Sequence, residues 1–438
     1  MVSFNQSSGQ DQVLLTYRPS SLKEFRQRAL QWASSHNVCT WLDNNEIPYP
    51  EGGFQALLAI GEYRRCPIET GQSFESIQRF HQQRKTWLFG YWGYDLKNEV
   101  ELLSSNNTDD VALPDIYFYE PTYLLRFTDE EVEVLKAEEH DAGWVIHQIE
   151  LTEVKSNEPI EPLAIQQKVS RDTYIQTVEQ IQQHIIEGDV YELNFCMEFF
   201  AEQAKIHPLS VYRQLNEVSP MPFSAYLQLG EHFVLSASPE RFIRKEGARL
   251  LSQPIKGTIR RGKTEEEDLR LKEQLRNDEK EIAENMMIVD LVRNDLSRTC
   301  KIGTVKVPEL FGIYGFRQVY QMISSIEGEL QDHIHPIQAI KAAFPMGSMT
   351  GAPKVMSMEL IERYEHSKRG LYSGAIGYIT PEGDFDFNVV IRSILYNQEK
   401  EYLSFQIGSA ITIDSSPEKE YEECLLKAKA IRTVLSGE

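Results

Sequence analysis

The order of strand-like and helix-like segments predicts an α+β fold built on antiparallel strands. Short apolar runs of strand type are interrupted by long helical stretches, and several neighbouring runs are joined by tight turns rather than by crossover helices. The chain has 438 residues, which suits one large domain or two closely packed ones. Its hydrophobic share of 41% is enough for a substantial core.

The chain divides into two regions of different character. Residues 1–151 are expected to form an N-terminal lobe, with strand-like runs at 12–17 and 87–92. Residues 152–167 are polar, contain two prolines and have no hydrophobic period, so we expect a connection there. Residues 168–438 carry the sharper signals and are expected to form the catalytic domain.

The first elements of this second region are a helix and two strand-like runs. The helix is expected over 172–187, with Asp172 as its N-cap and Gly188 just past its end. Residues 190–199 and 224–236 alternate like strands, and the second run bends at Gly230.

The later elements have clear start signals. Thr264 and Glu267 fit a capping box, and Asp278 with Glu281 repeats the pattern, so the helix is expected to break and restart toward Ser297. Residues 374–413 read as three antiparallel strands that turn at 381–384 and 397–400. Pro417 opens a final helix that runs to about residue 435.

Composition excludes several classes of function. With 66 acidic and 45 basic residues the net charge is −21, which disfavours binding to nucleic acid or to an anionic membrane. Residues 1–6 lack the features of a signal peptide, and no run approaches the ~18 apolar residues of a membrane span. The five cysteines have no zinc-site spacing. We therefore expect a cytoplasmic protein with reduced thiols.

Two residues are candidates for acid–base or covalent chemistry. Lys256 lies in an apolar setting between Pro254 and Gly257, and burial would favour the neutral amine that a nucleophile requires. Gly257 would let a substrate approach the backbone. A lysine–glycine pair is, however, more often a surface turn. Glu240 follows a proline at a strand end and could act as a general acid, although an exposed glutamate paired with Arg241 is the alternative.

Three carboxylates form a candidate metal site. Glu284 lies in a largely apolar helix, where a solvated acid is out of place, and Glu420 and Glu423 share one face of the last helix. Oxygen ligands without nearby cysteine or histidine suit Mg²⁺. The alternative for the last pair is that acids near a helix start simply favour the helix dipole.

Taken together, these segments resemble the chorismate-utilising enzyme family, which includes anthranilate synthase, aminodeoxychorismate synthase, isochorismate synthase and salicylate synthase. The resemblance covers roughly residues 170–435 and is much looser before them. It rests on the segments Ser238–Phe242, Pro254–Thr258, Met287–Asp295, Phe344–Lys354, Gly374–Tyr378 and Val390–Arg392. It implies two large antiparallel sheets stacked as a sandwich and flanked by helices.

The resemblance also implies roles for individual residues. Glu284 and Glu423 match Mg²⁺ ligands, with Glu420 assisting through water, and the metal would hold the ring carboxylate of chorismate. Tyr372 and Arg392 match residues that bind the enolpyruvyl carboxylate. The remaining substrate-binding positions are Ser348, Gly257, Thr258 and the small-residue loop Gly408, Ser409 and Ala410.

Lys256 separates the branches of the family. Anthranilate synthases usually have alanine there, whereas aminodeoxychorismate synthases similar to this chain have lysine. The resemblance then implies that Lys256 attacks C2 of chorismate, that Glu240 protonates the departing 4-hydroxyl and that ammonia displaces the lysine at C4. A separate glutamine amidotransferase subunit is the expected source of ammonia.

Two positions depart from the family pattern. Glu192 stands where water-using relatives have a lysine base, and Gln321 replaces a common histidine linked to pyruvate loss. The expected function is therefore component I of an aminodeoxychorismate synthase. Anthranilate synthase is the nearest alternative, followed by isochorismate synthase and by an inactive regulatory subunit.

Overall fold

A computed structural model describes residues 13–158 and 160–437 of the chain. The first residue of the strand-like run at 12–17, the chain start at 1–6 and Pro159 of the expected connection lie outside the described residues. The described part of that first run forms β1 (Leu15–Tyr17).

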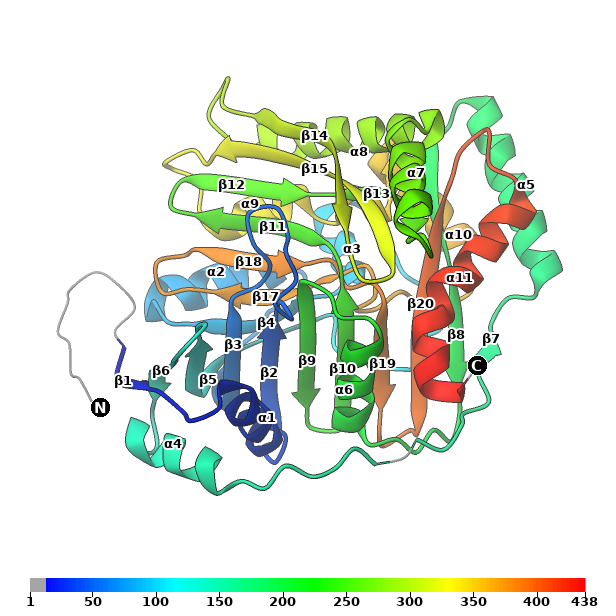
Figure 1. Cartoon of the computed structure of the whole chain (residues 1–438). Helices are drawn as coiled ribbons and strands as arrows, with labels where there is room; N and C mark the ends of the chain where they lie inside the picture. Colours follow the sequence, from blue (N-terminus) through cyan, green and yellow to red (C-terminus); the bar gives the residue numbers. More distant parts are fainter. Residues whose placement is uncertain (1–12, 159, 438) are drawn as a thin grey trace.

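A long antiparallel sheet forms the lower layer in Figure 1. β1 pairs with one end of this sheet and β7 (Gln166–Gln167) and β16 (Gly351–Ala352) pair with the last strand at the other end. Between them the order of strands is β6 (Val132–Ala137), β5 (Ile116–Phe127), β3 (Ala56–Arg65), β2 (Val38–Asp43), β9 (Phe223–Leu229), β10 (His232–Ser238), β19 (Ser393–Asn397), β20 (Tyr402–Ile411) and β8 (Glu192–Ala201).

A second antiparallel sheet continues from the first half of β5, on the same edge that β6 uses along the second half. Its order is β4 (Leu88–Trp92), β17 (Ala375–Ile379), β18 (Phe385–Asn388), β11 (Arg241–Glu246), β12 (Arg249–Gln253) and β15 (Val319–Glu329). β13 (Ile255–Arg260) follows β12 along one edge of β15, and β14 (Lys306–Gly315) pairs with the opposite edge. The antiparallel ladders confirm the predicted α+β class.

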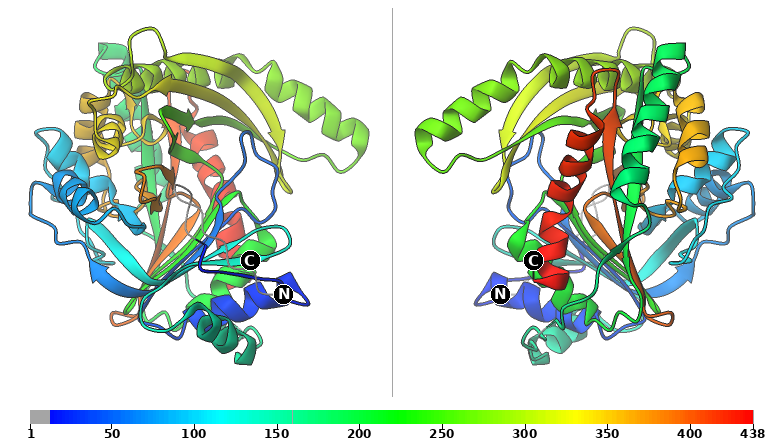
Figure 2. Two further views of the ribbon diagram at one scale, coloured as in Figure 1. Left: turned by 90° about the vertical axis from the view of Figure 1, so that its left-hand side faces the viewer. Right: turned by 90° about the vertical axis from the view of Figure 1, so that its right-hand side faces the viewer.

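Helices cover the outer surfaces of the two sheets (Figures 1 and 2). α8 (Glu279–Ser297) packs on β13 and β15, next to α7 (Glu265–Arg276). α5 (Arg171–Glu187) and α11 (Pro417–Ser436) lie side by side over β8 and β20. The other helices are α1 (Leu22–Ala33), α2 (Ser73–Arg84), α3 (Lys97–Val100), α4 (Ala142–Leu151), α6 (Pro208–Val218), α9 (Pro336–Ala343) and α10 (Lys354–Tyr364).

Most of the predicted helix signals are confirmed, with one shift. Thr264 caps α7 and Asp278 caps α8, so the helix does break and restart between them. Gly188 ends α5 in the left-handed region at φ 85°, as its position predicted. The N-cap of α5 is Ser170 rather than Asp172, because the Ser170 hydroxyl accepts the hydrogen bond from the Thr173 amide.

The prediction of three strands over residues 374–413 is wrong. Four strands occupy this segment, namely β17, β18, β19 and β20. The run breaks after β18, where Arg392 adopts a positive φ of 51° that no regular strand can contain. This break separates the second sheet from the first.

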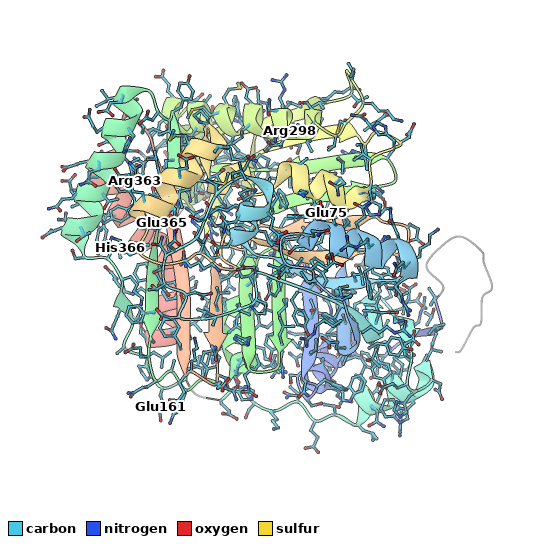
Figure 3. The ribbon with its side chains drawn as sticks, turned by 180° about the vertical axis from the view of Figure 1, so that it is seen from behind. Glu75, Glu161, Arg298, Arg363, Glu365 and His366 are labelled. Carbon is cyan, nitrogen blue, oxygen red and sulfur yellow. The ribbon has the colours of Figure 1, made fainter. Side chains whose placement is uncertain are left out.

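The first 151 residues and the rest of the chain contribute to one continuous hydrophobic core. β2 pairs with β9 and β4 pairs with β17, so strands from the first 151 residues lie inside both sheets. Phe74 of α2 stacks on Trp92 with ring centroids 4.7 Å apart. On the rear face, Glu75 of α2 pairs with Lys341 of α9 at 2.6 Å (Figure 3). Among the described residues, no helix combines the length and apolar character needed to cross a bilayer.

Candidate active site

A cavity of about 120 Å³ is lined by residues of both sheets and of helices α8 and α11. This volume accommodates more than a single water molecule. The structure brings every site residue expected from the sequence to its wall: Glu240, Lys256, Gly257, Thr258, Glu284, Ser348, Tyr372, Arg392, Gly408, Ser409, Ala410, Glu420 and Glu423.

The cavity exists because β20 is only partly paired. The ladder between β19 and β20 spans Tyr402 to Ser404, whereas β20 continues to Ile411 along β8. Beyond Ser404 this edge of β20 faces the cavity instead of β19. Polar backbone groups on an unpaired edge are available to bind a ligand.

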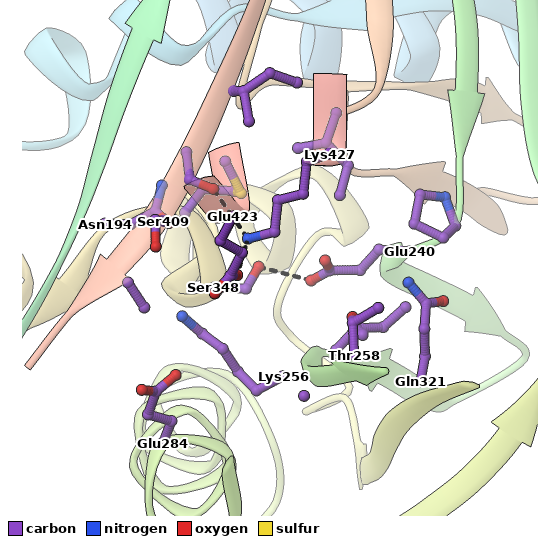
Figure 4. A pocket seen from close by; sticks show the side chains of 18 of the residues that line it. Asn194, Glu240, Lys256, Thr258, Glu284, Gln321, Ser348, Ser409, Glu423 and Lys427 are labelled. Atoms are coloured by element: carbon purple, nitrogen blue, oxygen red, sulfur yellow. Dashed lines mark hydrogen bonds and ion pairs between the residues drawn. The ribbon is translucent and has the colours of Figure 1, made fainter. Parts of the chain in front are cut away.

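Lys256 projects from the start of β13 into the cavity (Figure 4). Its Nζ donates a hydrogen bond to Glu192 Oε1 at 2.6 Å, and its side chain is 10% exposed. The amide of Asn285 donates to the Lys256 carbonyl at 3.3 Å, which ties the strand to α8. Burial lowers the pKa of Lys256, but Glu192 and Glu284 together outweigh burial and raise it above its ordinary value.

Glu240 lies in the connection between β10 and β11 and is only 3% exposed. Its Oε1 accepts a hydrogen bond from Ser348 Oγ at 2.6 Å (Figure 4). Burial raises the pKa of Glu240 to about 7 despite the opposing effects of Ser348 and Lys256. Glu240 can therefore hold a proton at neutral pH, as a general acid must.

The alternative in which Glu240 pairs with Arg241 is wrong. Arg241 points to the other side of β11, where its Nε donates to Asp386 Oδ1 at 2.9 Å. Both side chains of that ion pair are buried. Adjacent residues on a strand face opposite sides of the sheet, which explains the separation.

The three expected metal ligands line the cavity from two helices, but their carboxylate oxygens do not all lie within 4.8 Å of one another. Glu284 of α8 and Glu420 of α11 are buried, whereas Glu423 is 45% exposed at the cavity mouth. Lys280 Nζ lies between the first two, 3.0 Å from Glu420 Oε1 and 3.5 Å from Glu284 Oε1. The helix dipole alone does not explain these acids, because they face one another across the interface between α8 and α11.

This arrangement fits a hard divalent cation. Glu284 Oε1 is buried and accepts no hydrogen bond within the described part of the chain. Burial raises the pKa of Glu281 to about 7, and the neighbouring charges of Glu284 and Glu423 add to the effect. A cation bound by clustered carboxylates would relieve both the unpaired oxygen and the repulsion.

The opposite wall of the cavity is suited to an anion. Arg392 forms no ion pair with any described residue, and its Nη1 lies 4.0 Å from Met221 Sδ. Burial lowers its pKa to about 10, at which it is still charged at neutral pH. Its φ is positive at 51°. Tyr372 also lines the cavity, and its hydroxyl is 3.8 Å from Cys196 Sγ. A free guanidinium in a buried site binds carboxylates strongly.

Two local expectations need correction. Gly408, Ser409 and Ala410 belong to β20 rather than to a loop, and only their backbone groups turned away from β8 can reach a ligand. Gly257 has a φ of 95°, and a Cβ there would lie 3.2 Å from Met322 Cβ. Glycine is therefore required at position 257 by backbone conformation and packing as well as by any close approach of a ligand.

Sequence reasoning missed several polar residues of the cavity wall. Lys280 and Lys427 are the two most important, because each lies four residues along a helix from a carboxylate of the metal set. That spacing places their side chains together, and it could have revealed them. Asn194 and Gln406 also line the cavity but belong to strands whose pairing is long-range.

A buried lysine, a carboxyl with a raised pKa, several carboxylates and an arginine without an ion-pair partner among the described residues surround one cavity, as in an enzyme site for a small anionic substrate. The family model described as chorismate binding enzyme matches residues 49–433. The chain therefore belongs to the chorismate-binding enzyme family.

Curated relatives come from two branches of this family. Anthranilate synthase component 1 of Thermus thermophilus is 37% identical over 353 residues, which cover 78% of this chain and 76% of that protein. Aminodeoxychorismate synthase component 1 of Bacillus subtilis is 37% identical over 390 residues, covering 85% and 80%. The crystal structure of anthranilate synthase component I from Streptococcus pneumoniae superposes with a TM-score of 0.76 at 26% identity, covering 88% of this chain and 94% of that one.

Proposed function

We propose that this chain is component I of a 4-amino-4-deoxychorismate synthase, which replaces the 4-hydroxyl of chorismate by ammonia. The observation that carries the proposal is the lysine at position 256, whose amine lies in the same buried cavity as Glu240, a carboxyl whose pKa burial raises to about 7. A nucleophile and an acid on one cavity can act together on one ring.

The proposed reaction has two displacements. Lys256 Nζ forms a bond to C2 of the ring, the ring double bonds shift and the bond from C4 to oxygen breaks. Glu240 donates its proton to the departing hydroxyl, which leaves as water, and Ser348 holds the carboxylate that results. Ammonia then attacks C4, the double bonds shift back and Lys256 is released.

Substrate orientation follows from the charges around the cavity. Arg392 and Tyr372 line the cavity, and we propose that they bind the enolpyruvyl carboxylate, with further donors from the open edge of β20 at Gly408. We propose that Glu284 and Glu423, with Glu420 through water, hold Mg²⁺, which would supply positive charge for the ring carboxylate. Thr258 and Ser348 complete the wall near the ring.

Retention of the enolpyruvyl group is consistent with Gln321. This residue lies on β15 opposite Thr258, it lines the cavity, and an amide cannot exchange a proton near neutral pH. Its Oε1 is buried without a hydrogen-bond partner among the described residues. No general base is thereby offered at this position for the loss of pyruvate.

A glutamine amidotransferase subunit is the proposed source of ammonia. Two of the relatives described above are called component 1, which supports an assembly of more than one subunit. The division of this chain into residues 1–151, 152–167 and 168–438 stays a prediction.

Anthranilate synthase component I is the second candidate, because relatives of both names are 37% identical to this chain. Lys256 is the feature that favours the aminodeoxychorismate branch. Isochorismate synthase is disfavoured because Glu192 stands where a lysine base is expected. An inactive subunit is disfavoured by the completeness of the cavity wall.

Product analysis distinguishes these functions. Purified protein is incubated with chorismate, Mg²⁺ and ammonium at mildly alkaline pH, and the products are separated and weighed by mass spectrometry. We expect aminodeoxychorismate, which a lyase converts to 4-aminobenzoate. Anthranilate or isochorismate would replace the proposal by the corresponding alternative, and unchanged chorismate, also with an amidotransferase and glutamine, would support the inactive subunit.

A further inference from the structure

Glu192 is a buried acid that the proposed reaction does not yet use. It begins β8, it is 1% exposed, and it lies behind Lys256, outside the set of described residues that line the cavity. Its backbone is fixed by pairing with Ala352 of β16. A carboxylate held in such a place can act on a substrate only through Lys256.

The contact with Lys256 has the geometry of a proton-transfer pair. Lys256 Nζ and Glu192 Oε1 are 2.6 Å apart, which is short for a charge-assisted hydrogen bond. Glu192 Oε2 is buried and has no partner among the described residues, so no second donor stabilises the carboxylate. Among the described residues, Lys256 is therefore the one group placed to exchange a proton with the Glu192 carboxylate.

We propose that Glu192 is the proton acceptor that converts the Lys256 ammonium into the neutral amine and later returns the proton. This inference rests on the proposed function for the covalent step, but the proton exchange itself concerns the free enzyme.

The proton balance closes over one turnover. Lys256 gives a proton to Glu192, and the lone pair of its amine forms the bond to C2. The electrons of the broken C4–O bond leave with the hydroxyl, which Glu240 protonates to water. When ammonia attacks C4, the electrons of the C2–N bond return to Lys256. The new C4 ammonium gives a proton to Glu240, and Glu192 gives its proton back to Lys256.

Other charges also face this pair and are included in the expected pH behaviour. Glu284 acts from α8, Glu423 and Lys427 act from α11, and Glu240 acts from the β10–β11 connection. Glu192 is within ion-pair distance of Lys256, and none of these other groups in the described part of the chain is. Transfer of the proton from Lys256 to Glu192 changes the charge of both side chains but not their total number of protons. The fraction of the pair that is neutral therefore does not depend on pH as long as the pair keeps this proton.

The substitution E192Q distinguishes proton acceptance by Glu192 from a role that only positions Lys256. Glutamine keeps a hydrogen-bond acceptor for Lys256 but cannot take its proton, so the amine of the E192Q protein must lose its proton to solvent. In the free enzyme, competitive labelling of Lys256 with acetic anhydride, read by mass spectrometry across pH, reports the pKa of Lys256. We expect Lys256 of the E192Q protein to be labelled at least about tenfold more than that of the unaltered protein at neutral pH. Loss of the Glu192 charge lowers the pKa of Lys256, and one pKa unit corresponds to a tenfold change in the neutral fraction.

Turnover gives the second readout. At constant free ammonia, kcat of the unaltered enzyme should show no acid limb from Lys256, whereas kcat of E192Q should fall about tenfold per pH unit below the new pKa of Lys256. E192D should recover the pH-independent behaviour at a lower rate. E198Q is the matched control, because Glu198 is buried on the same strand and bonds only hydroxyl groups of Ser367, Tyr402 and Ser404.

Parallel kcat profiles for E192Q and the unaltered enzyme would overturn the inference. Labelling cannot decide it alone, because loss of the Glu192 charge changes the pKa of Lys256 whether or not Glu192 accepts its proton. Labelling needs no chorismate and supplies the pKa below which the E192Q profile must fall. Failure of the proposed function would instead appear in the identity of the product, with the labelling result unaffected.

Discussion

Lys256 has a chemical role only if its amine reaches the substrate, and a covalent adduct would show it. With chorismate and Mg²⁺ but no ammonia, we expect part of the protein to gain the mass of chorismate less one water, with the label on Lys256. K256A should lose the adduct and lose amination by at least about 100-fold, because covalent catalysis splits one difficult step into two. Intact-protein and peptide mass spectrometry make the measurement.

K256R is the control for charge, since it keeps a cation beside Glu192 but has no nucleophilic amine at neutral pH. An active K256R protein would contradict covalent catalysis. It would leave only an electrostatic role for the side chain.

Glu240 makes a prediction about stability that does not depend on activity. Burial raises its pKa from about 4.5 to about 7, so the folded protein disfavours the ionised form. The resulting loss of stability is absent at low pH, develops as pH rises from about 4.5 and is complete above about 7. E240Q should therefore stabilise the protein by about 2 to 3 kcal/mol near pH 8 and by much less near pH 4.5. Denaturant unfolding at both pH values measures the difference, and an equal effect at both would contradict it.

At this scale the sequence predicted the identity of the site residues better than their surroundings. Lys256 and Glu284 stood out because a lysine or an acid in an apolar segment is unusual, and Glu240 because it follows a proline at a strand end. The resemblance to the family was needed to prefer site roles over surface turns for Glu240 and Lys256. Their partners could not be predicted from local pattern. Ser348 is 108 residues from Glu240, and Glu192 is 64 residues from Lys256, so each contact depends on how distant strands pair.

Helices α8 and α11 both carry carboxylates that line the cavity, and the negative charges of these carboxylates repel one another. Lys280 of α8 bridges Glu284 and Glu420 and offsets part of their repulsion. Lys427 of α11 lies 2.8 Å from Glu423 and lowers the pKa of that carboxyl. The two lysines therefore keep the acidic interface together before a cation binds.

We expect E284Q to weaken Mg²⁺ binding by at least about 10-fold, since it removes one charged ligand from the set. Titration calorimetry with Mg²⁺ in the presence of chorismate measures the affinity. E279Q is the matched control, because Glu279 is an exposed acid on the same helix and lies outside the cavity wall. Equal weakening by both variants would show that general charge, and not ligation, sets the affinity.

Several helix boundaries followed cap and glycine signals, although the N-cap of α5 is Ser170 and not Asp172. Thr264, Asp278 and Gly188 each mark an observed end of a helix. The four strands between Gly374 and Ile413 were merged into three, because Val389, Val390 and Ile391 continue the apolar run through the break. Backbone conformation at Arg392, which is set by the meeting of the two sheets, is not encoded in local hydrophobicity.

At the scale of the whole molecule, both sheets combine early and late segments of the chain. The α+β class followed from hairpins and helices, but the pairing of β2 with β9 and of β4 with β17 did not. Such pairings join residues far apart in sequence, and their register is set by side-chain packing that a single sequence does not reveal. The cavity is a product of this long-range order, because it lies where β19 and β20 part.

β5 is the strand that both sheets share, since one half of it pairs with β4 and the other half with β6, while β3 runs along its opposite edge. Cutting the chain after residue 151 would leave each piece with interrupted ladders and an exposed interior. We expect the pieces 1–151 and 152–438 to aggregate when each is produced alone, and to assemble into one non-covalent particle when produced together. Co-purification through a tag on one piece, followed by calorimetry, would test this. A single unfolding transition in calorimetry would mean that the two pieces form one cooperative unit. A piece that folds alone would mean that the chain contains independently folding domains.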